Sequence, residues 1–300
     1  MQFGICVPHY GKPVNVKNIL EAARRAEELG FDSVWVTDHL LVHRTQEIIY
    51  RQNMLEPIAL LSHLAAVTRR VRIGTSVIIL PYRHPIAVAK MLATIDQLSE
   101  GRLIFGAGAG WMEEEFSALG RPYAERGAMS DENLRLIKEL WANETVSFEG
   151  TYTRFRDMQT SPRTVQRPHP PIWVGGNSRR ALRRVAELGD GWHATGTTPE
   201  AVTEGRIALQ GLWEKNHRPG SPVLSMRIPL FLEGVSTQVL SFPSRGRASL
   251  RGNVKQVIDA IGRYKEAGIE HVALEMSIQS HESIIQTMEA FMSEVMPQVT

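Results

Sequence analysis

The most regular feature of the sequence is a repeating unit in which an amphipathic helix is followed by a glycine and then by a short apolar strand. Three clear copies are ARRAEELG-FDSVWV, LRRVAELG-DGWHAT and IGRYKEAG-IEHVAL, with Gly30, Gly189 and Gly268 between helix and strand. Glycine readily adopts the left-handed conformation that closes many helices, so each helix is predicted to end there. In the first unit, apolar residues recur with helical spacing and form a stripe that packs against a sheet: Val16, Ile19, Leu20, Ala23 and Ala26.

The strands of these units are apolar along their whole length, which indicates parallel strands covered on both faces. Eight strands are predicted, at residues 3–8, 33–37, 71–78, 102–107, 171–174, 191–195, 224–232 and 271–276. Helices are predicted near 15–29, 56–68, 85–98, 112–119 with 130–141, 178–188, 199–215, 253–266 and 280–295. Eight alternating strands and helices predict a closed (β/α)₈ TIM barrel in a single domain, residues 1–300; an open doubly wound sheet is the alternative.

Two stretches interrupt the alternation and are predicted to be insertions. Residues 142–170, after the fourth unit, have the composition of a β-hairpin and a proline-rich loop. Residues 233–252, after the seventh strand, form a loop that contains Gly, Ser and Arg. Because loops on a barrel carry function, both insertions are expected to lie where they shape or cover an active site.

Composition narrows the class of protein. The chain has 300 residues, which suits one α/β barrel, and its 34 basic and 32 acidic residues give a formal charge of +2. With so small a net charge, the protein has no strong positive potential that would favour binding to nucleic acid or to a membrane. Cys6 is the single cysteine, and neither a signal peptide nor an apolar span is present, so we expect a cytoplasmic enzyme acting on a small molecule.

The segment PPIWVGGNS followed by RRALRR is a strand that leads through two glycines into a helix. Arg179 and Arg180 occupy the first turn of that helix, where its dipole disfavours cations unless an anion is bound. The alternative is that these arginines face solvent and pair with Glu187 and Asp190. The residues predicted to hold a phosphate are Gly175, Gly176, Asn177 and Ser178.

Alternate glycines end the fourth strand, at Gly106, Gly108 and Gly110. They do not form a dinucleotide fingerprint, because Trp111 and Glu113 stand where GxGxxG would need glycine. Two interpretations remain open: a flat backbone against which a planar ring lies, or close packing between strand and helix.

Asp38 and His39 follow the second strand directly, at the end of a barrel where catalytic residues lie. Histidine exchanges protons near neutral pH, although a strand-end histidine can also be purely structural. His39 and His43 have the spacing of metal ligands on a helix. However, Pro8-His9-Tyr10 follows strand one in place of His-x-His, so a metallohydrolase is not expected and no metal site is predicted.

Read together, these positions resemble the luciferase-like monooxygenase superfamily, and within it the oxidoreductases that depend on the deazaflavin coenzyme F420. The matching stretches extend over most of the chain, in barrel order: GFDSVWVTDH (30–39), residues 71–120, PHPPIWVGGNSRRALRRVAELGDGW (168–192) and GNVKQVIDAIGRYKEAG (252–268).

The resemblance implies a cofactor site at the C-terminal mouth of the barrel. A non-prolyl cis peptide after strand three, here Ser76–Val77, would support the back of the ring. Asp38 would bind the polar edge of the ring, His39 would stand near the reacting centre, and Ala109 and Gly110 would line the cofactor. The phosphate would lie at Gly175, Gly176, Asn177 and Ser178.

One position departs from the better-understood deazaflavin dehydrogenases, which carry a catalytic glutamate directly after the glycines of strand four. Trp111 stands there in this chain, so Glu113 and Glu114 are the candidate catalytic carboxyl groups. An indole at this position favours an apolar or aromatic substrate over a sugar phosphate.

The resemblance leaves several functions open. The first is F420-dependent hydride transfer, which Thr37-Asp38-His39 favours over the Glu-His-His typical of bacterial luciferases. The second is an FMN-dependent monooxygenase served by a separate flavin reductase, and the third is a non-catalytic flavin or deazaflavin carrier. A phosphosugar isomerase does not fit the region of Ser76–Val77 and Trp111. A homodimer is expected from the family.

Overall fold

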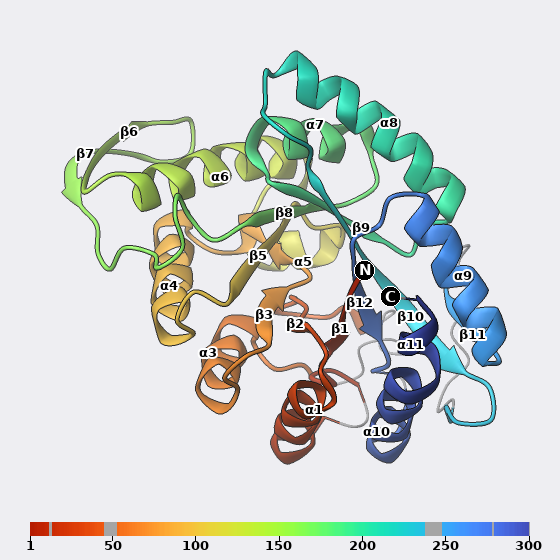
Figure 1. Ribbon diagram of the computed structural model, residues 1–300. Helices are drawn as coiled ribbons and strands as arrows, with labels where there is room; N and C mark the ends of the chain where they lie inside the picture. The colour runs from red at the N-terminus through yellow and green to blue at the C-terminus, as the bar shows by residue number, and fades with distance from the viewer. Residues whose placement is uncertain (12–13, 45–52, 238–247, 278, 300) are drawn as a thin grey trace.

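The computed structural model describes residues 1–11, 14–44, 53–237, 248–277 and 279–299. Within these ranges eight parallel strands close into a barrel surrounded by helices (Figure 1), as predicted. The barrel closes where the last strand pairs with the first, with Gln2 opposite His271 and Cys6 opposite Glu275. The strands are β1 (Gln2–Cys6), β2 (Ser33–Val36), β3 (Arg72–Thr75), β5 (Leu103–Gly108), β8 (Ile172–Gly175), β9 (Gly191–Thr195), β10 (Val223–Leu232) and β12 (His271–Glu275).

The helices follow the predicted positions closely. They are α1 (Val16–Leu29), α3 (Pro57–Val67), α4 (Pro85–Leu98), α5 (Glu113–Ala118), α6 (Arg126–Ala142), α7 (Arg179–Leu188), α8 (Pro199–Lys215), α9 (Val254–Glu266), α10 (His281–Ala290) and α11 (Met296–Val299), the last two joined by a π-helical turn (Phe291–Val295). The apolar face of α1 packs against the sheet through Ile19, Ala22, Ala23 and Ala26. Val16, predicted to belong to this stripe, is exposed because it begins the helix.

The glycines between helix and strand serve two different purposes. Gly30 and Gly268 have φ angles of 89° and 103°, so the left-handed conformation predicted for them is confirmed. The prediction is wrong for Gly189, whose φ is −98°. A Cβ atom at Gly189 would lie 2.9 Å from Val174 Cγ2, so this glycine is needed for close approach between α7 and β8.

The interior of the barrel is filled by aromatic side chains. Trp35 points inward and stacks on Trp173 with ring centroids 5.5 Å apart. It fits because the neighbouring strands carry glycine beside it: a Cβ atom at Gly74 would lie 2.4 Å from the Trp35 ring, and one at Gly4 would lie 2.7 Å from Trp35 Nε1. The barrel is therefore a packed core with no room for a ligand at this level.

Histidines in and around the barrel interior are held in the neutral form. Burial lowers the pKa of His193 and of His271 to about 3, and that of His9 to about 4. His271 lies between Ser33, whose Oγ is 2.7 Å from Nε2, and Gln2, whose Oε1 is 3.1 Å from Nδ1. These contacts satisfy an uncharged ring but cannot compensate a buried charge.

Acidification is therefore expected to destabilise the fold. Below about pH 6.5 the unfolded chain binds a proton at each of these histidines and the folded chain does not, so the free energy of unfolding falls as the pH drops. Each buried histidine contributes a slope of about 1.4 kcal/mol per pH unit in this window. Urea titrations between about pH 6 and 4 should show His271→Gln with a slope smaller by that amount. Parallel slopes for the two proteins would contradict the assignment.

The predicted third strand, 71–78, is divided in two. β3 ends at Thr75, and the next bond, Ser76–Val77, is the cis peptide that the family resemblance implied. The chain then resumes pairing with β5 through β4 (Ile78–Ile79). The interruption places Ser76 and Val77 at the C-terminal end of the barrel.

The insertion at 142–170 forms the predicted hairpin, with β6 (Thr145–Glu149) antiparallel to β7 (Arg154–Gln159). Its expected place at the active site is wrong: it lies outside the barrel beside α4 and α6 (Figure 1), where Glu132 of α6 accepts hydrogen bonds from the backbone of Thr151–Thr153. The physical reason is that the insertion follows a helix, and barrel helices return the chain to the end opposite the active site. Of the second insertion, residues 238–247 lie outside the described residues.

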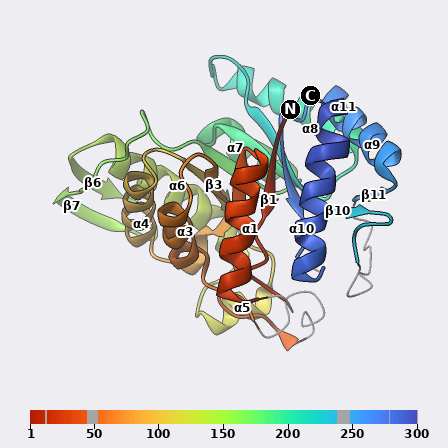
Figure 2. The same ribbon diagram turned by 60° about the horizontal axis from the view of Figure 1, so that its bottom comes forward.

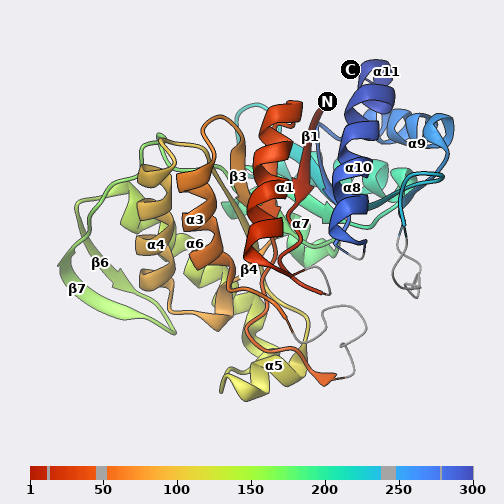
Figure 3. The ribbon, with the colours of Figure 1, turned by 90° about the horizontal axis from the view of Figure 1, so that it is seen from below.

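The two ends of the barrel differ. Figures 2 and 3 show α5 at one end and the N- and C-termini together at the other. Because α5 follows the C-terminal end of β5, its end is the one where barrel enzymes carry their active sites. In the described part of the chain, no helix combines the length and apolar character needed to cross a bilayer.

Candidate functional site

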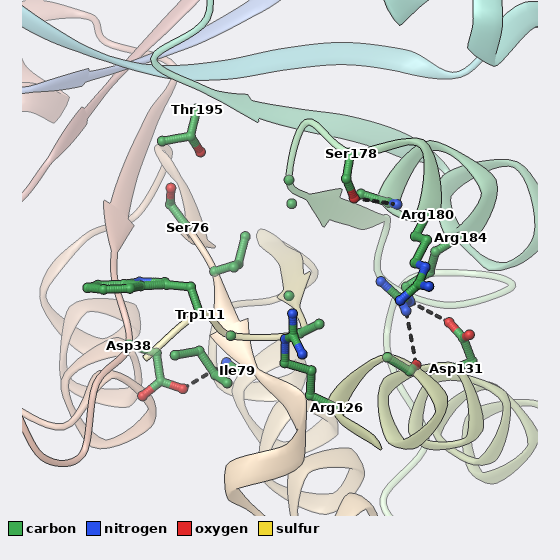
Figure 4. A pocket seen from close by; sticks show the side chains of 18 of the residues that line it. Asp38, Ser76, Ile79, Trp111, Arg126, Asp131, Ser178, Arg180, Arg184 and Thr195 are labelled. Carbon is green, nitrogen blue, oxygen red and sulfur yellow. Dashed lines mark hydrogen bonds and ion pairs between the residues drawn. The ribbon is translucent and has the colours of Figure 1, made fainter. Parts of the chain in front are cut away.

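A cavity of about 740 Å³ opens at the C-terminal end of the barrel (Figure 4). It is lined by residues that directly follow or end the strands, from Thr37–His39 after β2 to Arg227 in β10. Figure 4 shows Asp38, Ser76 and Trp111 on one side of this cavity and Ser178, Arg180, Arg184 and Asp131 on the other. The site therefore has a strand-end side with titratable groups and a helix side rich in arginine.

The floor of the cavity is built from Ser76 and Val77 and from glycines of the neighbouring strands. A Cβ atom at Gly108 would lie 2.4 Å from Val77 Cγ2, and one at Gly175 would lie 3.0 Å from Val77 Cγ1. At Gly106 it would lie 1.7 Å from the carbonyl oxygen of Thr75. The first two of the strand-four glycines are thus explained by close packing between strands, and Val77, Gly108 and Gly175 together line the cavity.

Asp38 lies at the end of β2 with its side chain fully buried. Its Oδ2 accepts hydrogen bonds from the backbone N–H of Ile79 at 2.9 Å and from Arg83 Nη1 at 2.6 Å, and its Oδ1 accepts one from Arg83 Nη2 at 2.9 Å. Burial raises the pKa of the Asp38 carboxyl, and the bidentate guanidinium opposes that shift. Asp38 thus fixes the loop after β3 to the end of β2.

His39 is 6% exposed and lines the cavity, as predicted. Its Nδ1 lies 2.6 Å from Glu115 Oε2, a carboxylate on α5 whose side chain is fully buried. Since a carboxylate accepts, Nδ1 carries the proton and donates it to Glu115. Glu115 therefore fixes the orientation of the ring, and proton exchange by this ring would involve Nε2.

Four donors within the described ranges hold Glu115. Besides His39, the Tyr82 hydroxyl donates to Oε2 at 2.8 Å, and the backbone N–H groups of Leu40 and Leu41 donate to Oε1 at 2.6 and 3.0 Å. Burial acts to raise the pKa of the Glu115 carboxyl, but these hydrogen bonds hold it below its ordinary value. Glu115 orients the His39 ring in the same way as the carboxylate of a hydrolase triad orients its histidine.

The sequence prediction missed Glu115 and selected its neighbours. Glu113 and Glu114 are exposed and do not line the cavity. A signal was present: Met112, Phe116 and Leu119 have helical spacing and mark the buried face of α5, and Glu115 lies on that face. Trp111, also in the cavity wall, is 43% exposed and stands edge-on to His39 with ring centroids 5.7 Å apart.

Arg227 is a second residue of the cavity wall that the prediction missed. It donates hydrogen bonds to the Ser76 carbonyl at 3.3 Å and to the Tyr10 hydroxyl at 3.0 Å, and it pairs with Glu275 at 3.0 Å. Although burial acts to raise the pKa of Glu275, Arg227 is the main cause that holds it below its ordinary value. The signal was a lone charge inside the apolar strand SMRIPLFL.

The phosphate residues predicted at the start of α7 lie mostly as expected. Gly175, Gly176 and Ser178 line the cavity, as do Ala109 and Gly110. Ser178 caps the helix by accepting from the Ala181 N–H at 3.2 Å. Asn177 does not reach the cavity, because its side chain bonds the backbone of Thr195 at 3.0 and 3.3 Å.

The alternative for the arginines of α7 is only partly realised. Arg183 does approach Glu187, at 3.7 Å, but Asp190 pairs with Arg218. Among the residues that the structure describes, neither Arg179 nor Arg180 pairs with a carboxylate. Arg180 lines the cavity. Gly176, which has a positive φ (111°) and no side chain, also lines it, just before the helix. This donor set fits a phosphate group.

Comparison with known proteins gives a consistent picture. Residues 1–234 match the luciferase-like monooxygenase family. An uncharacterized protein of Mycobacterium tuberculosis is 30% identical over 275 residues, which cover 86% of this chain and 87% of that protein. A monooxygenase from Streptomyces bottropensis has a similar structure, with a TM-score of 0.84, 25% identity and full coverage of both chains.

Two characterized relatives cover shorter stretches and differ in cofactor. An F420-dependent glucose-6-phosphate dehydrogenase of Amycolatopsis mediterranei is 34% identical over 60% of this chain and 53% of its own length. An FMNH₂-dependent dimethylsulfone monooxygenase of Pseudomonas putida is 34% identical over 50% of this chain and 42% of its own length.

Proposed function

Since this chain belongs to the luciferase-like monooxygenase family, we propose that it is a coenzyme F420-dependent oxidoreductase that transfers a hydride between the deazaflavin and a small organic substrate. The observation that carries the proposal is that one cavity is lined both by His39, which Glu115 orients from behind, and by a helix start that carries arginine. The first suits proton exchange with a substrate, and the second suits a cofactor phosphate.

The residues present fit such a cofactor. The start of α7, with Gly176, Ser178 and Arg180, would hold the phosphate, and the cavity floor at Val77 and Gly108 would receive the ring. When bound, a deazaflavin supplies a carbon centre that accepts or gives a hydride and does not readily activate oxygen.

His39 is the residue proposed to move the proton. Oxidising an alcohol requires a base for the hydroxyl proton, and reducing a carbonyl requires an acid. Glu115 keeps Nδ1 protonated, so Nε2 takes up the proton in one direction and returns it in the other. The nearby Trp111 ring gives this side of the cavity an apolar surface, which favours an apolar or aromatic substrate over a sugar phosphate.

The cofactor distinguishes this proposal from its alternatives. Thr37-Asp38-His39 and the F420-dependent relative favour the deazaflavin, whereas the FMNH₂-dependent relative supports an FMN monooxygenase that needs a separate flavin reductase. A carrier without turnover is the third candidate. Such a carrier would bind the cofactor ring, and His39 would have no catalytic role in it.

Parallel absorbance titrations with F420 and FMN test the proposal. We expect F420 to bind at least about tenfold more tightly than FMN, a difference of about 1.4 kcal/mol. Tighter binding of FMN would favour the monooxygenase, and binding of neither would reject both.

The phosphate position is tested in the same titrations with Gly176→Asp and Gly176→Asn. Both side chains meet the same backbone strain at φ 111°, but only aspartate adds a negative charge. We expect Gly176→Asp to bind F420 at least about tenfold more weakly than Gly176→Asn. Equal affinities would place the phosphate elsewhere.

A further inference from the structure

We infer that Arg227 sets the electrostatic potential at the cavity floor, so that the site favours the reduced and more negatively charged form of the bound ring. This inference rests on the proposed function, because it concerns the redox balance of the same cofactor. It assigns to one side chain of β10 the control of the reduction potential of that ring.

Arg227 lies in the middle of β10, inside an otherwise apolar strand. Its neighbours Met226 and Ile228 are fully buried on the other face of the strand, whereas the side chain of Arg227 is 18% exposed at the cavity wall. In the strand register Arg227 stands opposite Thr195 of β9, which also lines the cavity. Figure 4 shows Thr195 and Ser76 on the side of the cavity away from the arginines of α7. The charge of Arg227 is therefore separate from that of the phosphate side.

The guanidinium is held by two groups that do not line the cavity. Its Nη2 pairs with Glu275 Oε2 at 3.0 Å and donates to the Tyr10 hydroxyl at 3.0 Å. That hydroxyl donates to the same carboxylate oxygen at 2.7 Å. Because Arg227 lines the cavity and its two partners do not, the ion pair is oriented with its positive end at the cavity and its negative end behind it.

Arg227 also contacts the floor of the cavity. Its Nη1 donates to the Ser76 carbonyl at 3.3 Å, and Ser76 directly precedes Val77, where the ring is proposed to lie. The position of Ser76 is fixed by two further contacts: its N–H donates to the Val36 carbonyl at 2.7 Å, and its Oγ lies 2.7 Å from His193 Nε2. A positive charge is thus held rigidly beside the proposed ring site.

Stability gives little reason for an ion pair at this place. Replacing a buried pair by apolar side chains of similar size is often neutral or stabilising. Charge balance gives a better reason, because a hydride carries two electrons and one proton and the ring that accepts it gains one negative charge. A fixed cation stabilises such a charge more strongly in a partly buried site than in water. Arg227 should therefore favour the reduced ring over the oxidised ring and raise its reduction potential.

Dissociation constants of oxidised and reduced F420, measured for each variant, test the inference. Arg227→Gln should weaken binding of the reduced form at least about tenfold more than that of the oxidised form, which lowers the midpoint potential by about 30 mV for a two-electron couple. Glu275→Gln removes the negative end of the pair and should shift the ratio of the two constants in the opposite direction, by at least about fivefold. Arg227→Lys keeps the charge and should leave the ratio within about threefold of the original.

Arg72→Gln is the matched control, because it removes a partly buried strand arginine from the opposite end of the barrel. Arg72 begins β3, donates to the Leu103 carbonyl at 3.3 Å and is not among the residues that line the cavity. Its loss should leave the ratio unchanged. The opposite signs expected for Arg227→Gln and Glu275→Gln separate an electrostatic role from a structural one, since a damaged fold would weaken both redox forms alike.

Two results would overturn the inference. Equal loss of affinity for both redox forms in Arg227→Gln and Glu275→Gln would show that the pair only holds the floor in place. An unchanged ratio with a raised KM would make Arg227 a contact of the substrate instead. If the protein binds FMN but not F420, the proposed function fails, and the same ratio measured with oxidised and reduced FMN decides the inference by itself. Binding of neither ring would reject both.

Discussion

His39→Ala is expected to lower turnover at least about a hundredfold while changing cofactor affinity no more than about threefold. The imidazole lies at the strand-end side of the cavity, with its orientation set by Glu115, whereas the phosphate donors come from the start of α7. Removing the ring therefore removes proton transfer and leaves most of the binding contacts in place. Single-turnover kinetics and cofactor titration on the same preparation provide the measurement.

The competing explanation is that His39 only satisfies a buried carboxylate. Loss of one of the four donors to Glu115 then destabilises the fold by about 1–3 kcal/mol and leaves the rate per folded molecule unchanged. Unchanged single-turnover rates, together with a lower unfolding midpoint, would take His39 out of the chemistry. His63→Ala, at an exposed position on α3, is the control and should affect neither quantity.

Gly106→Ala is expected to lower the free energy of unfolding by at least about 3 kcal/mol. The added Cβ atom would lie 1.7 Å from the carbonyl oxygen of Thr75, and that backbone cannot move freely. The Thr75 hydroxyl donates to the Gly106 carbonyl at 2.7 Å and accepts from the Gly106 N–H at 2.9 Å. Relieving the clash would break this buried pairing just before the cavity floor.

Urea unfolding of both forms checks this result. Gly211→Ala is the matched control, because nothing lies within 4 Å of the atom it adds and the residue is inside helix α8. It should be neutral or stabilise the protein by up to about 1 kcal/mol. A Gly106→Ala protein as stable as the original would show that β3 and β5 can separate at no cost.

The parts of the fold that could be predicted are those set by periodicity. Hydrophobic runs and helical stripes mark β1, β2, α1 and the other repeated units, so the alternation of strands and helices follows from the sequence. The pairing of β1 with β12 decides between a closed barrel and an open sheet, and it is seen only in the structure. The break in the third strand does not, because Ser76 and Val77 continue an apolar run and only the family resemblance indicates their cis bond. The prediction for the place of the hairpin was wrong because the insertion follows a helix, and the chain that leaves a barrel helix lies at the end opposite the active site.

The residues of the site could also be predicted only in part from the sequence. The strand-end rule placed Asp38 and His39 at the cavity, since parallel strands end together there, and the family resemblance placed Ser76 and Val77 there. To choose among Glu113, Glu114 and Glu115 one must know which face of the short helix α5 is buried. A shift of one residue along this helix decides whether a carboxylate contacts His39 or solvent. Asn177 was predicted to bind the phosphate, but its side-chain amide instead forms hydrogen bonds with both the carbonyl and the N–H of Thr195.

The hold on His39 has a consequence for how such a scaffold acquires new reactions. Glu115 secures the imidazole from α5 through contacts that do not involve the Trp111 side chain, although the two rings stand edge-on. A substitution at position 111 can therefore change the surface beside His39 without altering the contacts that orient its ring. The side chain at position 111 can thus change without disturbing the neighbouring histidine, although both lie on the same side of the cavity.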